Sequence, residues 1–187
     1  MIAAAPRTSR RELEEMVQRW LAASHRAEET GQWKELLGAY YTDDAEYRWE
    51  LGADERFVVH GIEQIREIAI GYQMEGFKGW KYPYERVIID DVQGEVVAFW
   101  RQIAPYQRPD GSNYEVAGVG GSRFRYGGDF KWSFQHDFFD FECVMALFME
   151  LAADGLLDPV IRKKIQQREA AGSGLTFQHY RLNDGHD

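Results

Sequence analysis

The chain has 187 residues with a formal net charge of −9, and 44% of its residues are hydrophobic. This length fits one domain, and the acidic charge argues against nucleic acid or an anionic membrane as a partner, since both attract clustered positive charge. The single cysteine, Cys143, excludes an internal disulfide and a cysteine-based structural zinc site. Aromatic residues (6 Trp, 10 Tyr and 11 Phe) stand out at 14% of the chain.

The first half of the chain has the spacing of helices with one strand among them. Ser9 is a plausible N-cap for the first helix, and Glu12 completes a capping box. Apolar residues then recur at every third or fourth position, whereas the predicted strand alternates between apolar and polar residues. The pattern predicts helices over 9–27, 33–40 and 62–72, and a half-buried strand over 45–51.

The second half changes to a period of two and predicts an antiparallel meander of four strands, followed by two helices. Because helices and an antiparallel sheet occupy separate stretches, the fold class is α+β. A sheet this long twists and curves, so we expect a cone packed by the N-terminal helices. The predicted strands span 80–90, 95–104, 112–126 and 130–141, and the predicted helices span 143–151 and 158–170.

Several runs of residues carry a resemblance to a known family. They are Val17-Gln18-Arg19-Trp20, Gly31-Gln32-Trp33, Tyr41-Thr42-Asp43-Asp44-Ala45, Gly61-Ile62-Glu63-Gln64-Ile65-Arg66-Glu67 and the turn Gly127-Gly128-Asp129. The chain resembles the nuclear-transport-factor-2-like superfamily, and within it the SnoaL-like branch. Polyketide cyclases, ketosteroid isomerases and scytalone dehydratases are relatives of that branch. The resemblance covers about residues 10–141 and implies a curved cone around an apolar pocket.

The resemblance and the pattern together divide the chain into three parts. They are a flexible N-terminus over 1–8, a SnoaL-like cone domain over 9–142, and a C-terminal helical extension and tail over 143–187. The resemblance also implies a homodimer formed through the sheet, whose open face needs a cover. No secretory signal, membrane-spanning stretch or lipidation motif is visible, so we expect a cytoplasmic protein.

The catalytic groups of two relatives do not carry over to this chain. Ketosteroid isomerases use an oxyanion-donating Tyr, a general-base Asp and a protonated Asp, and the matching positions here are Trp20, Trp49 and Ser122. Scytalone dehydratases have a pocket Tyr that matches Tyr47, but their two catalytic histidines align near Tyr82 and Tyr106. We therefore expect neither mechanism as such.

The last predicted strand carries the strongest candidate for chemistry. Alternation places Gln135, Asp137 and Phe139 on one face, and the resemblance implies that this face points into the cone. A carboxylate among aromatic side chains loses hydration, so its pKa rises and it becomes a usable general acid or base near neutral pH. We predict that Asp137 moves a proton, with Tyr47 and Gln135 orienting the substrate or stabilising its oxyanion. The alternative is that Asp137 pairs with a buried group and only holds the fold.

Large aromatic side chains are the second candidate feature. They suit recognition of a flat apolar ligand, although they could equally be core. Gly118 and Gly120 share one face of the third meander strand with Ser122, and we expect them to leave that wall of the cone nearly bare. The predicted ligand-binding residues are Trp20, Trp49, Trp80, Tyr82, Trp100, Ser122 and Phe139.

Two functions fit this pattern. The first is an enzyme that isomerises, dehydrates, cyclises or hydrolyses a hydrophobic cyclic molecule, such as a steroid, a terpenoid or a polyketide, by general acid–base chemistry. The alternative is a non-catalytic ligand carrier or protein-interaction module of the same fold, in which the C-terminal helices plug the cone or dock on a partner. The 5 histidines are scattered along the chain, so we predict no metal and no cofactor.

Overall fold

The computed structural model describes residues 8–50 and 56–170 of the chain, and the predicted segment 1–8 and the tail beyond 170 lie almost wholly outside them. Helical segments precede and follow the sheet. The strands are β1 Tyr41–Glu50, β2 Arg56–His60, β3 Tyr84–Asp90, β4 Glu95–Trp100, β5 Ile103–Gln107, β6 Asn113–Glu115, β7 Gly120–Gly128 and β8 Lys131–Phe139. The helical segments are α1 Arg10–Thr30, α2 Trp33–Leu37, η1 Gly38–Tyr40, α3 Gly61–Gln64, η2 Ile65–Ala69, η3 Tyr72–Met74, α4 Phe141–Ala153 and α5 Pro159–Ala170.

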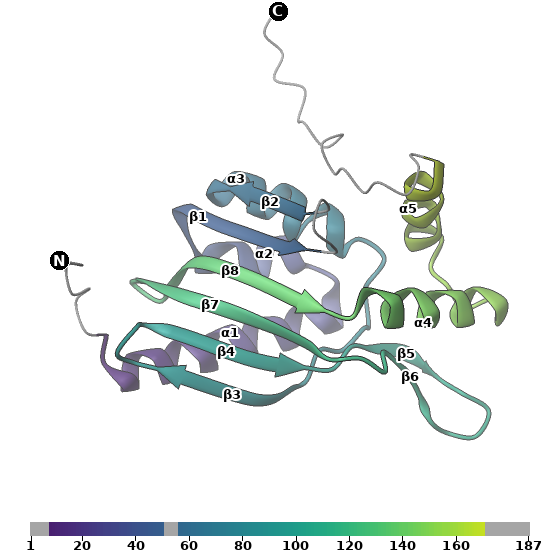
Figure 1. Ribbon diagram of the computed structural model, residues 1–187, viewed down its shortest axis with the longest axis horizontal. Helices are drawn as coiled ribbons and strands as arrows, with labels where there is room; N and C mark the ends of the chain where they lie inside the picture. The colour runs from purple at the N-terminus through teal and green to yellow at the C-terminus, as the bar shows by residue number, and fades with distance from the viewer. Residues whose placement is uncertain (1–7, 51–55, 171–187) are drawn as a thin grey trace, which may run out of the picture.

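The strands form a curved, unclosed six-stranded sheet in the order β2-β1-β8-β7-β4-β3, and β5 and β6 form a separate hairpin. Figure 1 shows α1 running along one face of the sheet, with α3 beside β2 and α4 continuing from the end of β8. This arrangement confirms the predicted α+β fold with N-terminal helices against a curved sheet and a C-terminal helical extension.

The first helix begins after Ser9, the predicted N-cap, while the Glu12 carboxylate, the other half of the predicted capping box, accepts a hydrogen bond from the Tyr126 hydroxyl. The Ser9 hydroxyl accepts a hydrogen bond from the backbone N–H of Glu12 at 3.2 Å, which satisfies one of the unpaired N–H groups at the start of the helix. The helix ends three residues later than predicted. Gly31, with φ at 75°, adopts the left-handed conformation that glycine allows, and its N–H closes the last turn on Ala27 O at 2.7 Å.

The four strands predicted for the meander correspond to β3, β4, β7 and β8, which pair antiparallel in that order, but the sheet as a whole is mixed rather than antiparallel. β1 pairs in parallel with β8, with Tyr47 opposite Gln135 and Trp49 opposite Asp137. The short strand β2, which has no separate signal in the sequence, then pairs with the outer edge of β1. Because β1 lies between β2 and β8, the first and last strands of the sheet become neighbours.

The long strands predicted in the second half are divided. The segment predicted over 95–104 ends as β4 at Trp100, and β5 leaves the main sheet to pair with β6. The strand predicted over 112–126 is likewise divided into β6 and β7. The helix predicted over 62–72 is confined to one α-helical turn followed by the π-helical turn η2.

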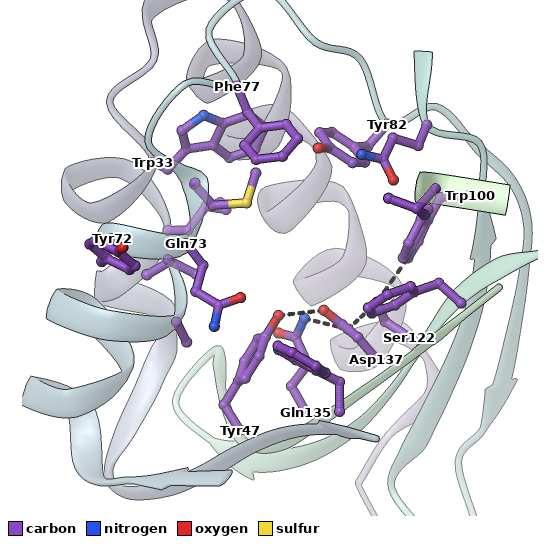
Figure 2. A pocket seen from close by; sticks show the side chains of 18 of the residues that line it. Trp33, Tyr47, Tyr72, Gln73, Phe77, Tyr82, Trp100, Ser122, Gln135 and Asp137 are labelled. Atoms are coloured by element: carbon purple, nitrogen blue, oxygen red, sulfur yellow. Dashed lines mark hydrogen bonds between the residues drawn. The ribbon is translucent and has the colours of Figure 1, made fainter. Parts of the chain in front are cut away.

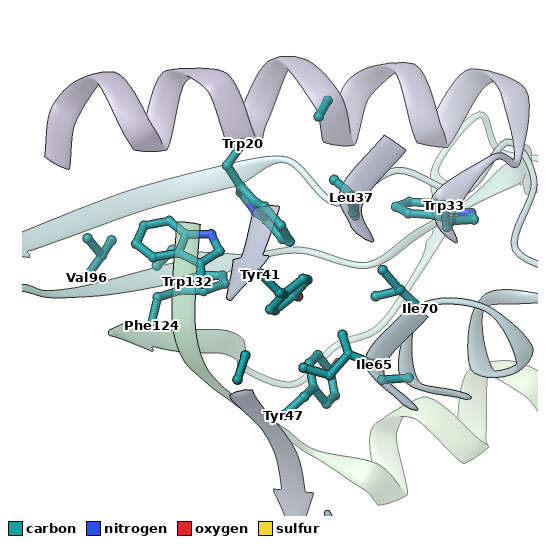
Figure 3. Close-up of a cluster of buried hydrophobic side chains, with 14 of the residues drawn as sticks. Trp20, Trp33, Leu37, Tyr41, Tyr47, Ile65, Ile70, Val96, Phe124 and Trp132 are labelled. Carbon is teal, nitrogen blue, oxygen red and sulfur yellow. The ribbon is translucent and has the colours of Figure 1, made fainter. Parts of the chain in front are cut away.

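Two clusters of buried apolar side chains hold the elements together. The larger joins α1, α2, η2 and the concave side of the sheet, and it includes Trp20, Phe124 and Trp132 (Figure 3). The smaller joins α4 and α5 to the β5–β6 hairpin and includes Trp80 and Phe148. No helix in the described part of the chain is both long and apolar enough to cross a membrane.

Candidate functional site

A cavity of about 780 Å³ lies between the concave side of the sheet and the helical segments. Its volume falls in the range of roughly 300 to 1,000 Å³ that is typical of small-molecule sites. Most of its lining side chains are aromatic or aliphatic. Helices α4 and α5 contribute Phe148 and Ile161 to the lining, so the C-terminal helices roof the cavity without filling it.

Asp137 lies on the wall of this cavity, on β8, and three side chains donate hydrogen bonds to its carboxylate. The Ser122 hydroxyl and the Gln135 amide donate to Oδ1 at 2.6 and 2.8 Å. The Tyr47 hydroxyl donates to Oδ2. Figure 2 shows these groups meeting at Asp137: Tyr47 and Ser122 come from the neighbouring strands β1 and β7, and Gln135 lies on β8 itself. The strand pairing explains the convergence, because β7 and β1 flank β8 on its two sides.

Further hydrogen bonds fix the direction in which these donors point. The Trp100 indole N–H donates to the Ser122 hydroxyl at 2.9 Å, which leaves the Ser122 proton for Asp137. The Tyr41 hydroxyl donates to the Gln135 carbonyl oxygen, which turns the Gln135 amide nitrogen toward Asp137. Because every donor is aimed at the carboxylate, the network favours the ionised form of Asp137.

Burial and hydrogen bonding act in opposite directions on Asp137. Burial raises the pKa of its carboxyl above the ordinary value, while the bonds from Ser122, Tyr47 and Gln135 lower that pKa in part. Burial, and next the charge of Asp137, also raise the pKa of Tyr41 and Tyr47 well above the usual value for tyrosine, so both stay protonated as donors. The site is therefore a carboxylate that can exchange a proton, supported by tyrosines that keep theirs.

The structure brings nearly all predicted site residues to the cavity. Trp80 is the exception: its ring packs against Phe77 and Phe148, with centroids 5.2 and 5.9 Å away, in the smaller cluster. The prediction placed Trp80 inside a strand, but β3 begins only at Tyr84, so the alternation of that strand does not reach it. The cavity is lined by Asp137, Tyr47, Gln135, Trp20, Trp49, Tyr82, Trp100, Ser122 and Phe139.

The wall predicted to be bare is filled by other side chains. A Cβ atom on Gly120 would lie under 3.0 Å from the Trp100 ring, and one on Gly118 would lie equally close to Asp140. The glycines therefore make room for close neighbours rather than for the ligand. At Gly120 that neighbour is the indole that orients Ser122.

Two lining residues have no signal in the sequence. Gln73 comes from η3, in a stretch without helical or strand periodicity, and Lys164 comes from α5, far along the chain. The Lys164 ammonium donates to the backbone carbonyl of Glu75 at 3.0 Å and to that of Tyr72. Burial lowers the pKa of Lys164 to about 8. Only the three-dimensional contact between α5 and η3 reveals either residue.

Residues 8–50 and 56–170 contain no group of three His, Cys, Asp or Glu side chains that could hold a metal ion. The charged side chains among the described lining residues are Asp137 and Lys164. Asp137 is thus a carboxylate inside a largely apolar cavity, and a carboxylate in such surroundings is a candidate general acid or base.

Solved structures share this fold with the chain. A protein assigned as a SnoaL-like polyketide cyclase from Jannaschia sp. CCS1 is 20% identical, with a TM-score of 0.54, over 76% of this chain and 96% of that chain. An LEH-like epoxide hydrolase from M. tuberculosis is 17% identical, with a TM-score of 0.52, over 77% of this chain and 97% of that one. An NTF2-like protein from Anabaena variabilis ATCC 29413 is 19% identical, with a TM-score of 0.52, over 71% of this chain and 93% of that chain.

These likenesses confirm that the chain has the nuclear-transport-factor-2-like fold that its sequence resembles. No family model matches the sequence, and no curated protein matches it. At identities of 20% and below, the shared property is the fold alone, because one fold supports many activities.

Proposed function

We propose that the protein binds a hydrophobic cyclic molecule, such as a steroid, a terpenoid or a polyketide, and that Asp137 transfers a proton within it. The observation that supports this function most strongly is a carboxylate on the wall of a large apolar cavity, with three donors aimed at it. A buried carboxylate of raised pKa is the usual form of a general base that works without a cofactor.

In this proposal Asp137 is the base in the resting protein, a role supported by the three donors that favour its ionised form. The carboxylate takes a proton from an acidic C–H bond of the ligand, and the electron pair of that bond moves into the ligand. The carboxylic acid so formed returns the proton at a second position, which completes an isomerisation or prepares a ring closure. Asp137 then regains its charge, and no atom is lost from the protein.

Tyr47 and Gln135 act in this proposal as positioning residues. The hydroxyl proton of Tyr47 is already donated to Asp137, and the amide of Gln135 is held between Tyr41 and Asp137. Neither group is aimed at a ligand oxygen in this arrangement. Their effect is to fix the carboxylate and to limit the rise of its pKa.

The substitution Asp137→Asn tests this function. The carbonyl oxygen of the new amide would still accept hydrogen bonds from Ser122 and Gln135, so we expect the fold and ligand affinity to remain. Turnover should fall by about 10² to 10⁴-fold, the usual contribution of a general base. A thermal-shift screen of steroids, terpenoids and polyketide aromatics identifies ligands, because binding raises the melting temperature. Hydrogen–deuterium exchange at ligand carbons, followed by NMR, then reports proton transfer.

The roof formed by α4 and α5 favours one alternative, a ligand carrier that closes around its cargo. The same variant separates the two functions. A carrier would bind its ligand without exchanging any carbon-bound proton, and Asp137→Asn would change nothing but affinity. Equal exchange in the variant and the native protein would contradict the assignment of Asp137.

We also propose that the protein forms a homodimer through the outer face of the sheet. Ile88 on β3 and Val58 on β2, the two edge strands of the sheet, are apolar side chains that are 51% and 37% exposed, and a second copy of the chain packed on this face would cover them. Light scattering after size exclusion tests this proposal. A dimer would have twice the chain mass of 21.7 kDa, and a particle of 21.7 kDa would contradict it.

A further inference from the structure

The proposed proton transfer leaves one requirement open. When a base removes a carbon-bound proton, negative charge develops on an oxygen of the ligand, and a hydrogen-bond donor near that oxygen stabilises it. The hydroxyls of Ser122 and Tyr47 each donate their single proton to the carboxylate, and Gln135 directs one of its two amide N–H bonds to it. A donor elsewhere on the cavity wall, not engaged by Asp137, is better placed to meet a ligand oxygen.

Gln73 carries such a donor. Its side chain lines the cavity, and its amide nitrogen is buried without a hydrogen-bond partner among the described residues. A buried amide left unpaired costs about 1 to 3 kcal/mol, so a site that keeps one has a use for it. Figure 2 shows the Gln73 amide inside the cavity, on the side from which Tyr47 and Gln135 project. The Trp33 indole nitrogen is also buried and unpaired, but it lies on the ring edge that faces away from Asp137.

The backbone that carries Gln73 is held in place from both sides. The Met74 N–H donates to the Gly71 carbonyl at 3.0 Å, which closes the short turn η3. From α5, the Lys164 ammonium donates to the carbonyls of Tyr72 and Glu75, on either side of Gln73. The amide therefore starts from a fixed base and needs little ordering when it meets a ligand.

The charges on the wall restrict what Gln73 can recognise. Among the described lining residues the charged groups are Asp137, which repels anions, and Lys164, whose ammonium is occupied by backbone carbonyls. An anionic ligand would thus have no free cation among these residues to pair with. A neutral ligand with an acceptor oxygen fits an amide N–H, and a carbonyl is the acceptor that also acidifies a neighbouring C–H bond for Asp137.

We propose that Gln73 donates a hydrogen bond from its amide nitrogen to a carbonyl oxygen of the ligand, and that the substrates are neutral apolar carbonyl compounds. This inference rests on the proposed function. In the reaction, Asp137 removes the proton from the carbon next to the carbonyl, and the electron pair moves to the carbonyl oxygen as an enolate. Gln73 stabilises that charge until Asp137 returns the proton to carbon.

A pair of probes that differ in one group tests the inference. The ketone is 2-acetonaphthone with a ¹³C-labelled carbonyl, and 2-isopropenylnaphthalene is the hydrocarbon of nearly the same shape. Both are titrated against the native protein and Gln73→Leu by quenching of tryptophan fluorescence. We expect the affinity of the variant for the ketone to fall by about five- to tenfold, which corresponds to the loss of one hydrogen bond. Its affinity for the hydrocarbon should not change.

The carbonyl itself gives a second readout. On binding to the native protein, its stretching frequency should fall and its ¹³C resonance should move downfield, and both changes should be absent in Gln73→Leu. Gln73→Met, which keeps the unbranched length of the side chain, serves if the Leu variant does not fold. Gln93→Leu, an exposed glutamine in the turn between β3 and β4, is the matched control and should behave as the native protein.

The outcomes separate this inference from the proposed function. Equal ketone affinity in the native protein and both Gln73 variants, with the carbonyl signals unchanged, would overturn the inference and leave the role of Asp137 intact. An unshifted carbonyl in the native protein would show that Gln73 meets only water, and would overturn it as well. If neither probe binds to the native protein, the apolar site and the inference that rests on it both fail.

Discussion

The two ends of strand β8 use aromatic side chains in opposite ways. At the packed end, beside the β7–β8 hairpin, Trp132 is fully buried and stacks on Phe124 with ring centroids 4.7 Å apart. At the hollow end, beside α4, Asp137 and Phe139 line the cavity of about 780 Å³. The same strand therefore contributes to a close-packed core at its start and to the wall of a cavity at its finish.

The difference between the ends lies in what closes them. At the packed end α1 lies directly over the sheet, and the Trp20 ring fills the space with its centroid 5.5 Å from that of Phe124. At the hollow end the cavity separates the sheet from α4 and α5, which contribute Phe148 and Ile161 to its lining. Aromatic residues form a core where a helix lies close to the sheet and line a cavity where it does not.

Truncating one residue at each end of β8 should produce the largest contrast. We expect Trp132→Ala to lower the free energy of unfolding by about 3 to 5 kcal/mol, because it opens a new void in a close-packed region. Phe139→Ala should cost about 1 to 2 kcal/mol, since its ring already borders empty space. Urea unfolding measures both. Equal losses of unfolding free energy in the two variants would contradict the contrast between a close-packed end and a hollow end of β8.

Gly120→Ala should have an intermediate effect, confined to the hollow end. The new methyl group would overlap the Trp100 ring, so the indole must move and release Ser122. We expect a loss of about 1 to 3 kcal/mol in unfolding free energy, as overpacking usually causes, together with weaker ligand binding. The exposed neighbour Val119→Ala is the control, and it should change stability by less than about 0.5 kcal/mol.

The smallest effect we expect is a pH dependence of stability that comes from Asp137. Because burial raises the pKa of Asp137 in the folded protein, the folded state binds more protons than the unfolded state between the ordinary and the raised pKa. The stabilising effect is thus complete below the ordinary pKa and is lost as pH rises through the raised one. The Asp137→Asn variant has no carboxyl group at this position, so its unfolding free energy should not show this fall with pH. Unfolding curves of both proteins across acidic pH would show parallel profiles if Asp137 titrated normally.

Much of the architecture and the central carboxylate could be predicted from the sequence. The N-cap at Ser9 depends on contacts within four residues, and the alternation along β8 places Gln135 and Asp137 on one face without any knowledge of the rest of the fold. Local patterns of this kind are fixed by backbone geometry, so they survive in the folded chain.

Features that depend on distant contacts could not be predicted. The alternation of a strand does not reveal its partner, so no pattern in the chain indicates the parallel pairing of β1 with β8. Trp80 looks like a strand residue by composition, yet it packs beneath α4 because β3 starts four residues later. The position of Gln73 at the cavity depends on contacts between distant segments, including the hydrogen bond from Lys164 to its backbone carbonyl, so the sequence does not single it out.

The parallel pairing of β1 with β8 has a consequence for how the protein acquires its site. Tyr47 and Asp137 are 90 positions apart in the chain, and their contact closes a loop that contains most of the sheet. Such non-local contacts are slow to form, because the entropy of loop closure is lost before they contribute stability. A nascent chain that has emerged only as far as β7 therefore has neither the carboxylate nor the strand that would hold it. The site can therefore form only after β8 has emerged and paired with β1.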